Sequence, residues 1–365
     1  MLGFKALVES RKPPPRREQI RAGPLVRVVT ATPEDVRVEV VAYGTVRPAT
    51  EIELAPQVSG MVVEVSPNLV SGGFVAEGEI LARIDPRDYE LELRAARAAV
   101  EQATFQLEKV RAEAEAAREE WRQVYGDRPP PEEAGLLFRG PQLRRARADL
   151  EAARARVEAA RLALERTVLR APFAARVRSE NVDVGQYLTP GRAIARLYAT
   201  DAVEVVFPVA TGDLGWIDPP HPERGPRVVV EGTYAGRKAR WEGRIVRTEA
   251  EVDAASRTVG LVARVEEPFR AGRDPLVVGL FVTGRIQGKT LRHVFPLPRE
   301  ALREGSVVWV VDNGGSLRFR PVEVARVEGD RVLVSHGLEP GERVVVSRVD
   351  AVADGMAVRV AEVEP

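Results

Sequence analysis

Two long heptad segments, placed between two β-patterned segments that resemble each other, constrain the fold of this chain most strongly. Asp85 and Pro86 form a typical helix start, and an apolar seam then advances in alternating steps of four and three residues. The seam runs through Tyr89, Leu93, Ala96, Val100, Ala103, Leu107, Val110, Ala114, Ala117, Trp121 and Val124. This pattern predicts one helix that ends near Gly126 and is on the order of 50–60 Å long.

A second seam follows Gly140 and Pro141 without a slip in register. Its residues are Leu143, Ala146, Leu150, Ala153, Val157, Ala160, Leu164 and Thr167. Both stripes are narrow, which is typical of a coiled coil, whereas helices on a larger core carry a wider apolar face. We therefore expect an antiparallel hairpin, with two independent surface helices as the alternative.

The β-patterned segments on either side of the hairpin share their spacing. Ala55 and Pro56 correspond to Ala171 and Pro172, and Phe74 takes the place that Tyr187 has in the second segment. The turn glycines match as well, and we expect positive φ and a purely structural role at Gly60, Gly72, Gly78, Gly185 and Gly191. Matched spacing indicates two repeats. One β-sandwich made of both halves, with the hairpin projecting from it, is the simplest fold.

The composition of the chain excludes several classes of function. The 54 basic and 54 acidic residues cancel, so no concentrated positive field favours nucleic acid, and we expect no nucleic-acid partner. The chain has no cysteine, which excludes disulfides, thiolate metal ligands and thiol nucleophiles. His221, His293 and His336 lack the spacing of metal ligands, and no nucleophile elbow or phosphate loop is present. We expect no enzyme activity, no catalytic residue, no cofactor and no metal.

Several segments together resemble the periplasmic adaptors, or membrane fusion proteins, of RND-type tripartite efflux pumps. Residues 55–65 and 72–89 are similar to the first half of the family's lipoyl-like domain and its entry to the hairpin, and residues 164–173 and 182–191 are similar to the second half. Residues 252–259 and 279–282 resemble its β-barrel domain, and residues 337–346 its membrane-proximal domain. Each motif is weak alone, but their order matches the family from about residue 30 to residue 360.

The resemblance implies a mainly β chain with a long α-helical hairpin and nested domains. The expected domains are a basic tail or anchor remnant (1–24), a membrane-proximal β-domain (25–50 and 291–365), a lipoyl-like domain (51–85 and 168–199), the hairpin (86–167) and a β-barrel (200–290). It also implies a non-catalytic adaptor in the periplasm, associated with the inner membrane. Its expected partners are an inner-membrane RND transporter, an outer-membrane channel and further copies in a ring of three or six.

Two features depart from the family pattern. No cysteine is available for lipidation, and residues 1–8 are at most the end of a membrane anchor, with a basic linker as the other reading. The spaced Arg, Leu and Ser that many members carry at the hairpin tip are not found in residues 118–145. An apolar group stands there instead, made of Trp121, Tyr125, Leu136, Leu137 and Phe138, with Arg139 beside it. These residues either contact a partner or pack on one another across the turn.

Two other functions stay open at this level. The chain could serve an ABC-type exporter, whose adaptors share this architecture. It could also be a soluble module that binds a small ligand or metal in the barrel around residues 200–290, although no convergent polar cluster in the sequence indicates such a site.

Overall fold

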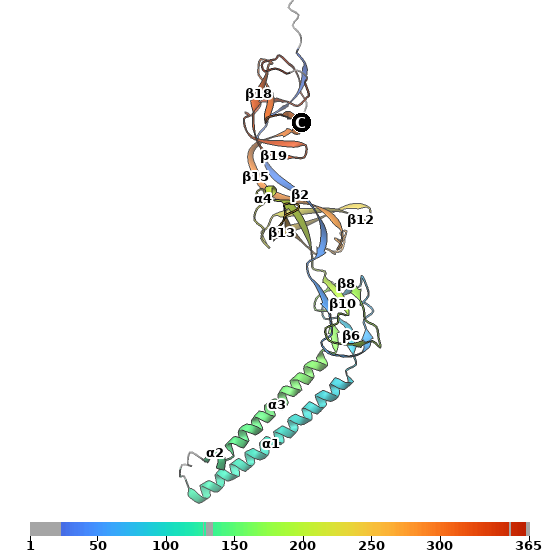
Figure 1. The fold of residues 1–365 in the computed structure, drawn as a ribbon, viewed down its shortest axis with the longest axis vertical. Coiled ribbons are helices and arrows are strands. Elements are labelled where there is room, and N and C mark those ends of the chain that lie inside the picture. Colours follow the sequence, from blue (N-terminus) through green and yellow to red (C-terminus); the bar gives the residue numbers. More distant parts are fainter. Residues whose placement is uncertain (1–22, 127, 129–133, 350–351, 363–365) are drawn as a thin grey trace, which may run out of the picture.

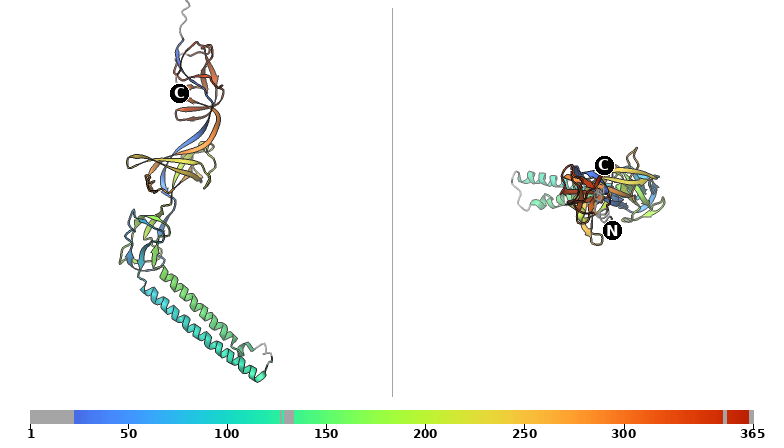
Figure 2. Two further views of the ribbon diagram at one scale, coloured as in Figure 1. Left: turned by 180° about the vertical axis from the view of Figure 1, so that it is seen from behind. Right: turned by 90° about the horizontal axis from the view of Figure 1, so that it is seen from above.

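The computed structural model describes residues 23–126, 128, 134–349 and 352–362. The molecule is elongated, and four modules follow one another along its length (Figure 1). The chain runs outward through the membrane-proximal, barrel and lipoyl-like domains, turns at the hairpin tip, and returns through them in reverse order. Figure 2 shows the same linear arrangement from behind. The nesting places the hairpin tip and the membrane-proximal domain at opposite ends.

The hairpin consists of α1 (Arg87–Tyr125) and α3 (Gly140–Glu165), with the short α2 (Ala134–Leu137) at the tip. Every seam residue from Tyr89 to Trp121 is buried or half-buried, whereas Val124 is exposed. The fully buried members are Leu93, Val110 and Ala114 on α1, and Ala146, Leu150, Ala153 and Ala160 on α3. Alanine predominates on α3 because small side chains let two helices approach closely along a narrow seam. The predicted antiparallel hairpin is confirmed.

Local chemistry explains where the hairpin helices begin and end. The Asp85 carboxylate accepts a hydrogen bond from the backbone N–H of Arg87 at 3.1 Å, which satisfies one donor of the first turn. Hydrogen bonds from Arg87 keep the pKa of Asp85 below its usual value. At the other end of α1, Gly126 has φ 60° and its N–H bonds to the carbonyl of Arg122.

The lipoyl-like domain is built from both β segments. Two four-stranded sheets have the orders β3-β10-β8-β5 and β7-β6-β4-β9, so each sheet takes strands from both halves. The strands are β3 (Glu51–Leu54), β4 (Gly60–Val65), β5 (Phe74–Val75), β6 (Ile80–Ile84), β7 (Val168–Arg170), β8 (Ala175–Glu180), β9 (Tyr187–Leu188) and β10 (Ala195–Ala199). Leu81 and Ile84 of the first half share one core with Leu188 and Leu197 of the second.

The two halves are related by an internal twofold. Strands β4, β5 and β6 correspond to β8, β9 and β10, and exchanging them, together with β3 and β7, converts one sheet order into the other. The turns correspond too: the Gly72 N–H bonds to the Val177 carbonyl, and the Gly185 N–H to the Val62 carbonyl, both at 2.8 Å. Gly72, Gly78, Gly185 and Gly191 lie in turns with φ of 83°, 76°, 89° and 83°, whereas Gly60, expected in a turn, begins strand β4 with φ 152°. Side chains are strained at most such values, which explains glycine here.

Six strands close the barrel in the order β12-β13-β14-β11-β2-β15, because β12 also pairs with β15. They are β2 (Glu34–Pro48), β11 (Ala202–Ala210), β12 (Arg227–Tyr234), β13 (Arg237–Asp253), β14 (Thr258–Glu266) and β15 (Phe281–Pro298), and α4 (Thr211–Leu214) follows β11. Phe207 is fully buried in the barrel core. A Cβ on Gly284 would lie 2.5 Å from the Phe207 ring, so a side chain there would displace it.

The membrane-proximal domain gathers the start and the end of the described chain. Strand β1 (Leu25–Thr30) lies between β21 (Arg343–Val345), antiparallel, and β22 (Arg359–Glu362), parallel. The remaining elements are η1 (Arg299–Ala301), β16 (Leu302–Arg303), β17 (Val307–Val311), β18 (Leu317–Pro321), β19 (Glu323–Glu328) and β20 (Arg331–His336). β20 pairs with the far end of β15, so one long strand belongs to both the barrel and this domain.

One predicted domain boundary is wrong. Residues 34–48 were expected in the membrane-proximal domain, but they form β2, which pairs with β11 and β15 in the barrel. The reason lies in the uninterrupted alternation of β2, which points Val38, Val40, Ala42 and Val46 into the barrel core. Within the range 25–50, the side chains of Val26, Val28 and Ala31 pack in the membrane-proximal cores.

A half-buried ion cluster joins these two domains. Arg326 of β19 is only 13% exposed and contacts Asp213 of α4 at 2.9 Å and Glu328 at 3.1 Å. The same Glu328 carboxylate accepts a hydrogen bond from the backbone N–H of Glu39 in β2. These contacts tie the membrane-proximal domain to the barrel beside the shared strands β2 and β15.

Candidate interaction surfaces

The hairpin tip divides its apolar residues into two groups. Trp121 stacks on Tyr125 with ring centroids 4.2 Å apart, and it meets Phe138 edge-on at 6.2 Å. These three aromatic residues therefore pack on one another across the turn. Leu136 and Leu137 are 71% and 52% exposed. Packing across the turn is thus seen for the aromatic residues, and contact of the exposed leucines with a partner stays a prediction.

Arg139, next to the exposed leucines, links the start of α3 to α1. It occupies the left-handed region with φ 55° directly before α3, and its guanidinium lies 3.3 Å from the Glu113 carboxylate of α1. Glu113, Leu136, Leu137 and Arg139 line one shallow hollow on the flank of the tip. Residues 129–133 lie outside the described residues.

At the opposite end, the membrane-proximal domain exposes an aromatic and basic surface. Trp309 and Phe319 are directly opposite each other on β17 and β18, with ring centroids 6.0 Å apart. The Arg303 guanidinium lies over the Trp309 ring at 4.1 Å, and burial lowers the pKa of Arg303. Phe319 remains 43% exposed.

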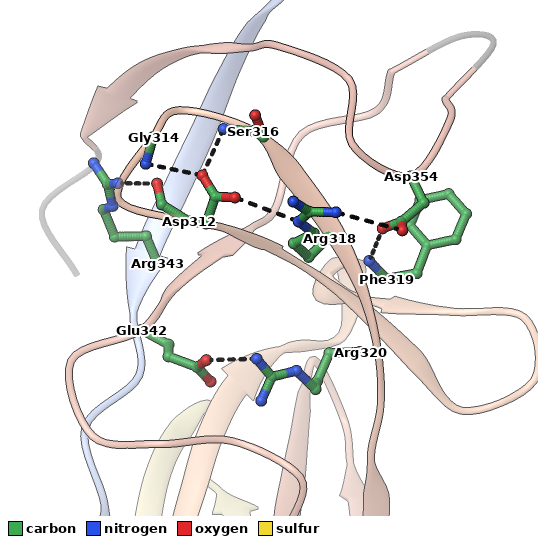
Figure 3. A network of polar contacts seen from close by, with 9 residues as sticks. All are labelled: Asp312, Gly314, Ser316, Arg318, Phe319, Arg320, Glu342, Arg343 and Asp354. Carbon is green, nitrogen blue, oxygen red and sulfur yellow. Dashed lines mark hydrogen bonds and ion pairs between the residues drawn. The ribbon is translucent and has the colours of Figure 1, made fainter.

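A polar network stiffens this end (Figure 3). The Asp312 carboxylate accepts hydrogen bonds from the N–H groups of Gly314 and Ser316, at 2.9 and 2.8 Å, and contacts Arg318 at 3.3 Å. The Ser316 N–H is the main cause of the lowered pKa of Asp312. Arg318 also reaches Asp354, whose carboxylate accepts the Phe319 N–H at 3.0 Å. Because these groups satisfy one another, the network has a structural role.

The lipoyl-like domain uses equivalent aromatic residues differently in its two halves. Phe74 contacts Phe269 of the barrel edge-on at 5.9 Å, and Arg176 lies 4.7 Å from its ring. Tyr187, its counterpart, pairs with Met61 and is 63% exposed. Val63 and Val184 extend this apolar surface. One repeat thus contacts the neighbouring domain, while the other presents apolar surface to solvent.

A carboxylate in the first lipoyl-like half predicts an acid-dependent loss of stability. Glu79 accepts hydrogen bonds from Ala76 N–H at 2.8 Å and Asn68 Nδ2 at 2.7 Å, and these lower its pKa. A lowered folded pKa stabilises the protein above the unfolded value of about 4.3, and that stability is lost as the pH falls through the folded value. We expect Glu79→Gln to reduce the melting temperature at pH 7, with the difference shrinking toward pH 3.5. A Glu77→Gln control in the same turn should show no such trend. If the difference in melting temperature between Glu79→Gln and the native protein does not change with pH, the ionised Glu79 does not stabilise the turn.

The part of the chain that the structure describes contains no cluster of three or more His, Asp or Glu side chains able to hold a metal. His221 accepts hydrogen bonds from the N–H groups of Glu223 and Arg224, and His336 lies 3.2 Å from Glu323 at an exposed position. Among the described residues, no helix has the length and apolar character needed to span a membrane.

Comparisons with known proteins agree with this architecture. The model of the barrel-sandwich hybrid domain of RND membrane fusion proteins matches residues 50–199, and the model of their C-terminal permuted SH3 domain matches residues 297–351. Together the two models cover more than half of the chain. This chain belongs to the RND membrane fusion protein family.

Individual relatives of this membrane fusion protein cover nearly its full length. The multidrug resistance protein MdtA of Proteus mirabilis is 28% identical over 92% of this chain and 80% of that protein. MdtA of Yersinia pseudotuberculosis is 27% identical over 92% of this chain and 75% of its own length. Two solved structures share the fold: MacA of Actinobacillus actinomycetemcomitans (TM-score 0.60, 19% identity) and a MacA–MexA chimera with the Pseudomonas aeruginosa MexA hairpin (TM-score 0.59, 21% identity). Each covers 88% of this chain and 99% of the solved chain.

Sequence reasoning missed the contacts that depend on strand register. Phe269, Trp309, Phe319 and Arg326 carried no signal in their local pattern, because their partners lie in strands or loops that are distant in the sequence. The alternation of β17 could have placed Trp309 on the outer face, but not opposite Phe319.

Proposed function

We propose that this membrane fusion protein is a non-catalytic periplasmic adaptor, associated with the inner membrane, that links an RND transporter to an outer-membrane channel. The observation that carries the proposal is the separation of its two contact surfaces. Leu136 and Leu137 lie at the hairpin tip, and Trp309 and Phe319 lie in the domain at the opposite end (Figure 1). A rod with apolar surface at both ends suits a bridge between two partners.

The relatives support the RND assignment over an ABC-type exporter. Both matching family models describe RND adaptors, and the MdtA relatives are named multidrug resistance proteins. We infer that this protein also takes part in the export of multiple drugs, as the name of these relatives indicates. The charged ion pairs along the hairpin remain solvated, as expected of a spacer.

Site-specific photocrosslinking in cells tests the bridge. A photoreactive amino acid at position 137 should capture an outer-membrane channel, and one at position 319 an inner-membrane transporter. The control is position 105 on α1, where Phe105 is 67% exposed but lies away from the tip. If position 319 instead captures an ABC-type ATPase, the inner-membrane partner is an ABC-type exporter and not an RND transporter. Failure of both end positions to capture any envelope protein would contradict the adaptor function.

We also propose a ring of three or six copies. Met61, Val63, Val184 and Tyr187 expose apolar side chains, and Tyr187 takes in the second repeat the place of Phe74, which contacts the barrel from the first. A ring needs such a face to meet a different face of the next copy. Chemical crosslinking should give a ladder of bands that ends at the trimer or the hexamer, and Tyr187→Glu should shorten it. A monomer under all conditions would contradict the ring.

A further inference from the structure

Three arginines lie side by side on neighbouring strands of the barrel. Arg227 of β12 is directly opposite Arg244 of β13, and Arg244 is directly opposite Arg264 of β14. Directly paired residues point to the same face of a sheet. The residues next to them, Val228, Ile245 and Val265, are buried in the barrel core, so the three arginines project from the outer face.

The arginine row lines a hollow of about 350 Å³. Its other lining residues include Pro222 from the loop before β12 and Gln287 from β15. The loop is held close to β13: the Gly225 N–H bonds to the His221 carbonyl at 2.8 Å, and a Cβ on Gly225 would lie 1.9 Å from the Ile245 carbonyl oxygen. The hollow therefore has a fixed wall on its loop side.

The charges in the hollow are incompletely balanced. Arg264 contacts Glu266 at 2.8 Å and Asp201 at 3.6 Å. Arg244 reaches only the Gly225 carbonyl, at 3.4 Å, and in the described part of the chain neither Arg227 nor Arg244 has a carboxylate within 4.0 Å. Glu266 and Asp201 both pair with Arg264, which leaves Glu242, among the described residues, as the one other lining carboxylate beside Arg227 and Arg244. Like charges directly opposite each other on a sheet are destabilising.

We propose that this hollow, the arginine hollow, binds an oxyanion of the phosphate class. Guanidinium groups bind phosphate oxygens through paired, charge-assisted hydrogen bonds, and an anion between Arg227 and Arg244 would relieve their repulsion. Gln287 completes the site: Arg37 donates a hydrogen bond to its side-chain oxygen at 3.3 Å, which leaves the amide NH₂ as a donor. The proposal does not depend on the adaptor function.

Thermal unfolding and calorimetry with inorganic phosphate and pyrophosphate test the site. The full chain is measured with each anion and with chloride at equal ionic strength, alongside Arg227→Gln and Arg244→Gln. Arg240→Gln is the matched control, because Arg240 lies on the same strand but pairs with Glu231 outside the hollow. We expect pyrophosphate to raise the melting temperature of the native protein and the control, and Arg244→Gln to weaken its binding at least tenfold.

The two arginine variants also carry a signature that a purely structural role would not produce. Without phosphate at low salt, Arg244→Gln should melt at the same temperature as the native protein or higher, because a repulsive neighbour has been removed. Equal responses of native and variant proteins to pyrophosphate would overturn the proposal. Binding of poly-glutamate without any response to either phosphate would also overturn it and assign the hollow to an acidic protein partner.

Discussion

Replacing Leu136 and Leu137 together with glutamate is expected to abolish export while leaving the fold intact. Leu136 and Leu137 are 71% and 52% exposed, whereas the three aromatic residues of the tip pack on one another, so replacing the leucines should cost the fold little packing. A hot-spot residue of an interface contributes about 2 kcal/mol or more, and two buried carboxylates would add a desolvation cost. Drug susceptibility of a deletion strain carrying the variant should equal that of the strain without adaptor.

The control is the conservative pair Leu136→Met and Leu137→Met, which keeps the apolar surface and should retain export. Thermal unfolding of both proteins should match that of the native chain. If the glutamate variant restores full resistance, the exposed leucines are not the docking surface, and the aromatic group around Trp121 becomes the remaining candidate at the tip.

Phe207→Ala is expected to have the largest effect on stability, lowering the free energy of unfolding of the barrel by about 3–5 kcal/mol. Phe207 is fully buried, and Gly284 leaves no side chain to fill the cavity. Urea unfolding followed by tryptophan fluorescence reports this transition, because two of the four tryptophans, Trp241 and Trp216, pack in or against the same core.

Phe281→Ala provides a matched comparison, because it removes the same atoms from a phenylalanine of the same barrel that is 65% exposed. The Phe281 ring stacks on Tyr43, with ring centroids 6.2 Å apart, so we expect its removal to lower the free energy of unfolding by at most about 1 kcal/mol. Equal losses for the two variants would show that Phe207 does not anchor the barrel.

The hairpin could be predicted residue by residue because its information is local. A seam that alternates steps of three and four residues defines which face of each helix is buried, and the structure buries that face from Tyr89 to Trp121. The seam does not report where a helix leaves its partner, so Val124 was included although it is exposed. The two lipoyl-like halves could be predicted equally well, because the repeated glycine spacing can be read from a single sequence.

The barrel was less predictable because its contacts depend on which strands are neighbours. A short break at residues 31–33, which ends in Pro33, separates β1 from β2, but the local pattern of the break does not say which domain the next strand joins. The arginine hollow illustrates the same limit. Arg227, Arg244 and Arg264 lie on three strands joined by two hairpin turns, and only the strand register brings them together.

Engineered cysteines offer the most direct test of the central claim, that two distant β halves close into one domain from which the hairpin projects. The native chain contains no cysteine, so Met61→Cys combined with Tyr187→Cys introduces a single pair at directly opposite positions of β4 and β9. Directly paired strand residues have Cα atoms about 4.5–5.5 Å apart, within the range of a disulfide. We expect an intramolecular disulfide in the monomer band under mild oxidation, and none for Met61→Cys paired with Val124→Cys at the far end of α1. Free thiols at both positions, with normal folding, would contradict the account.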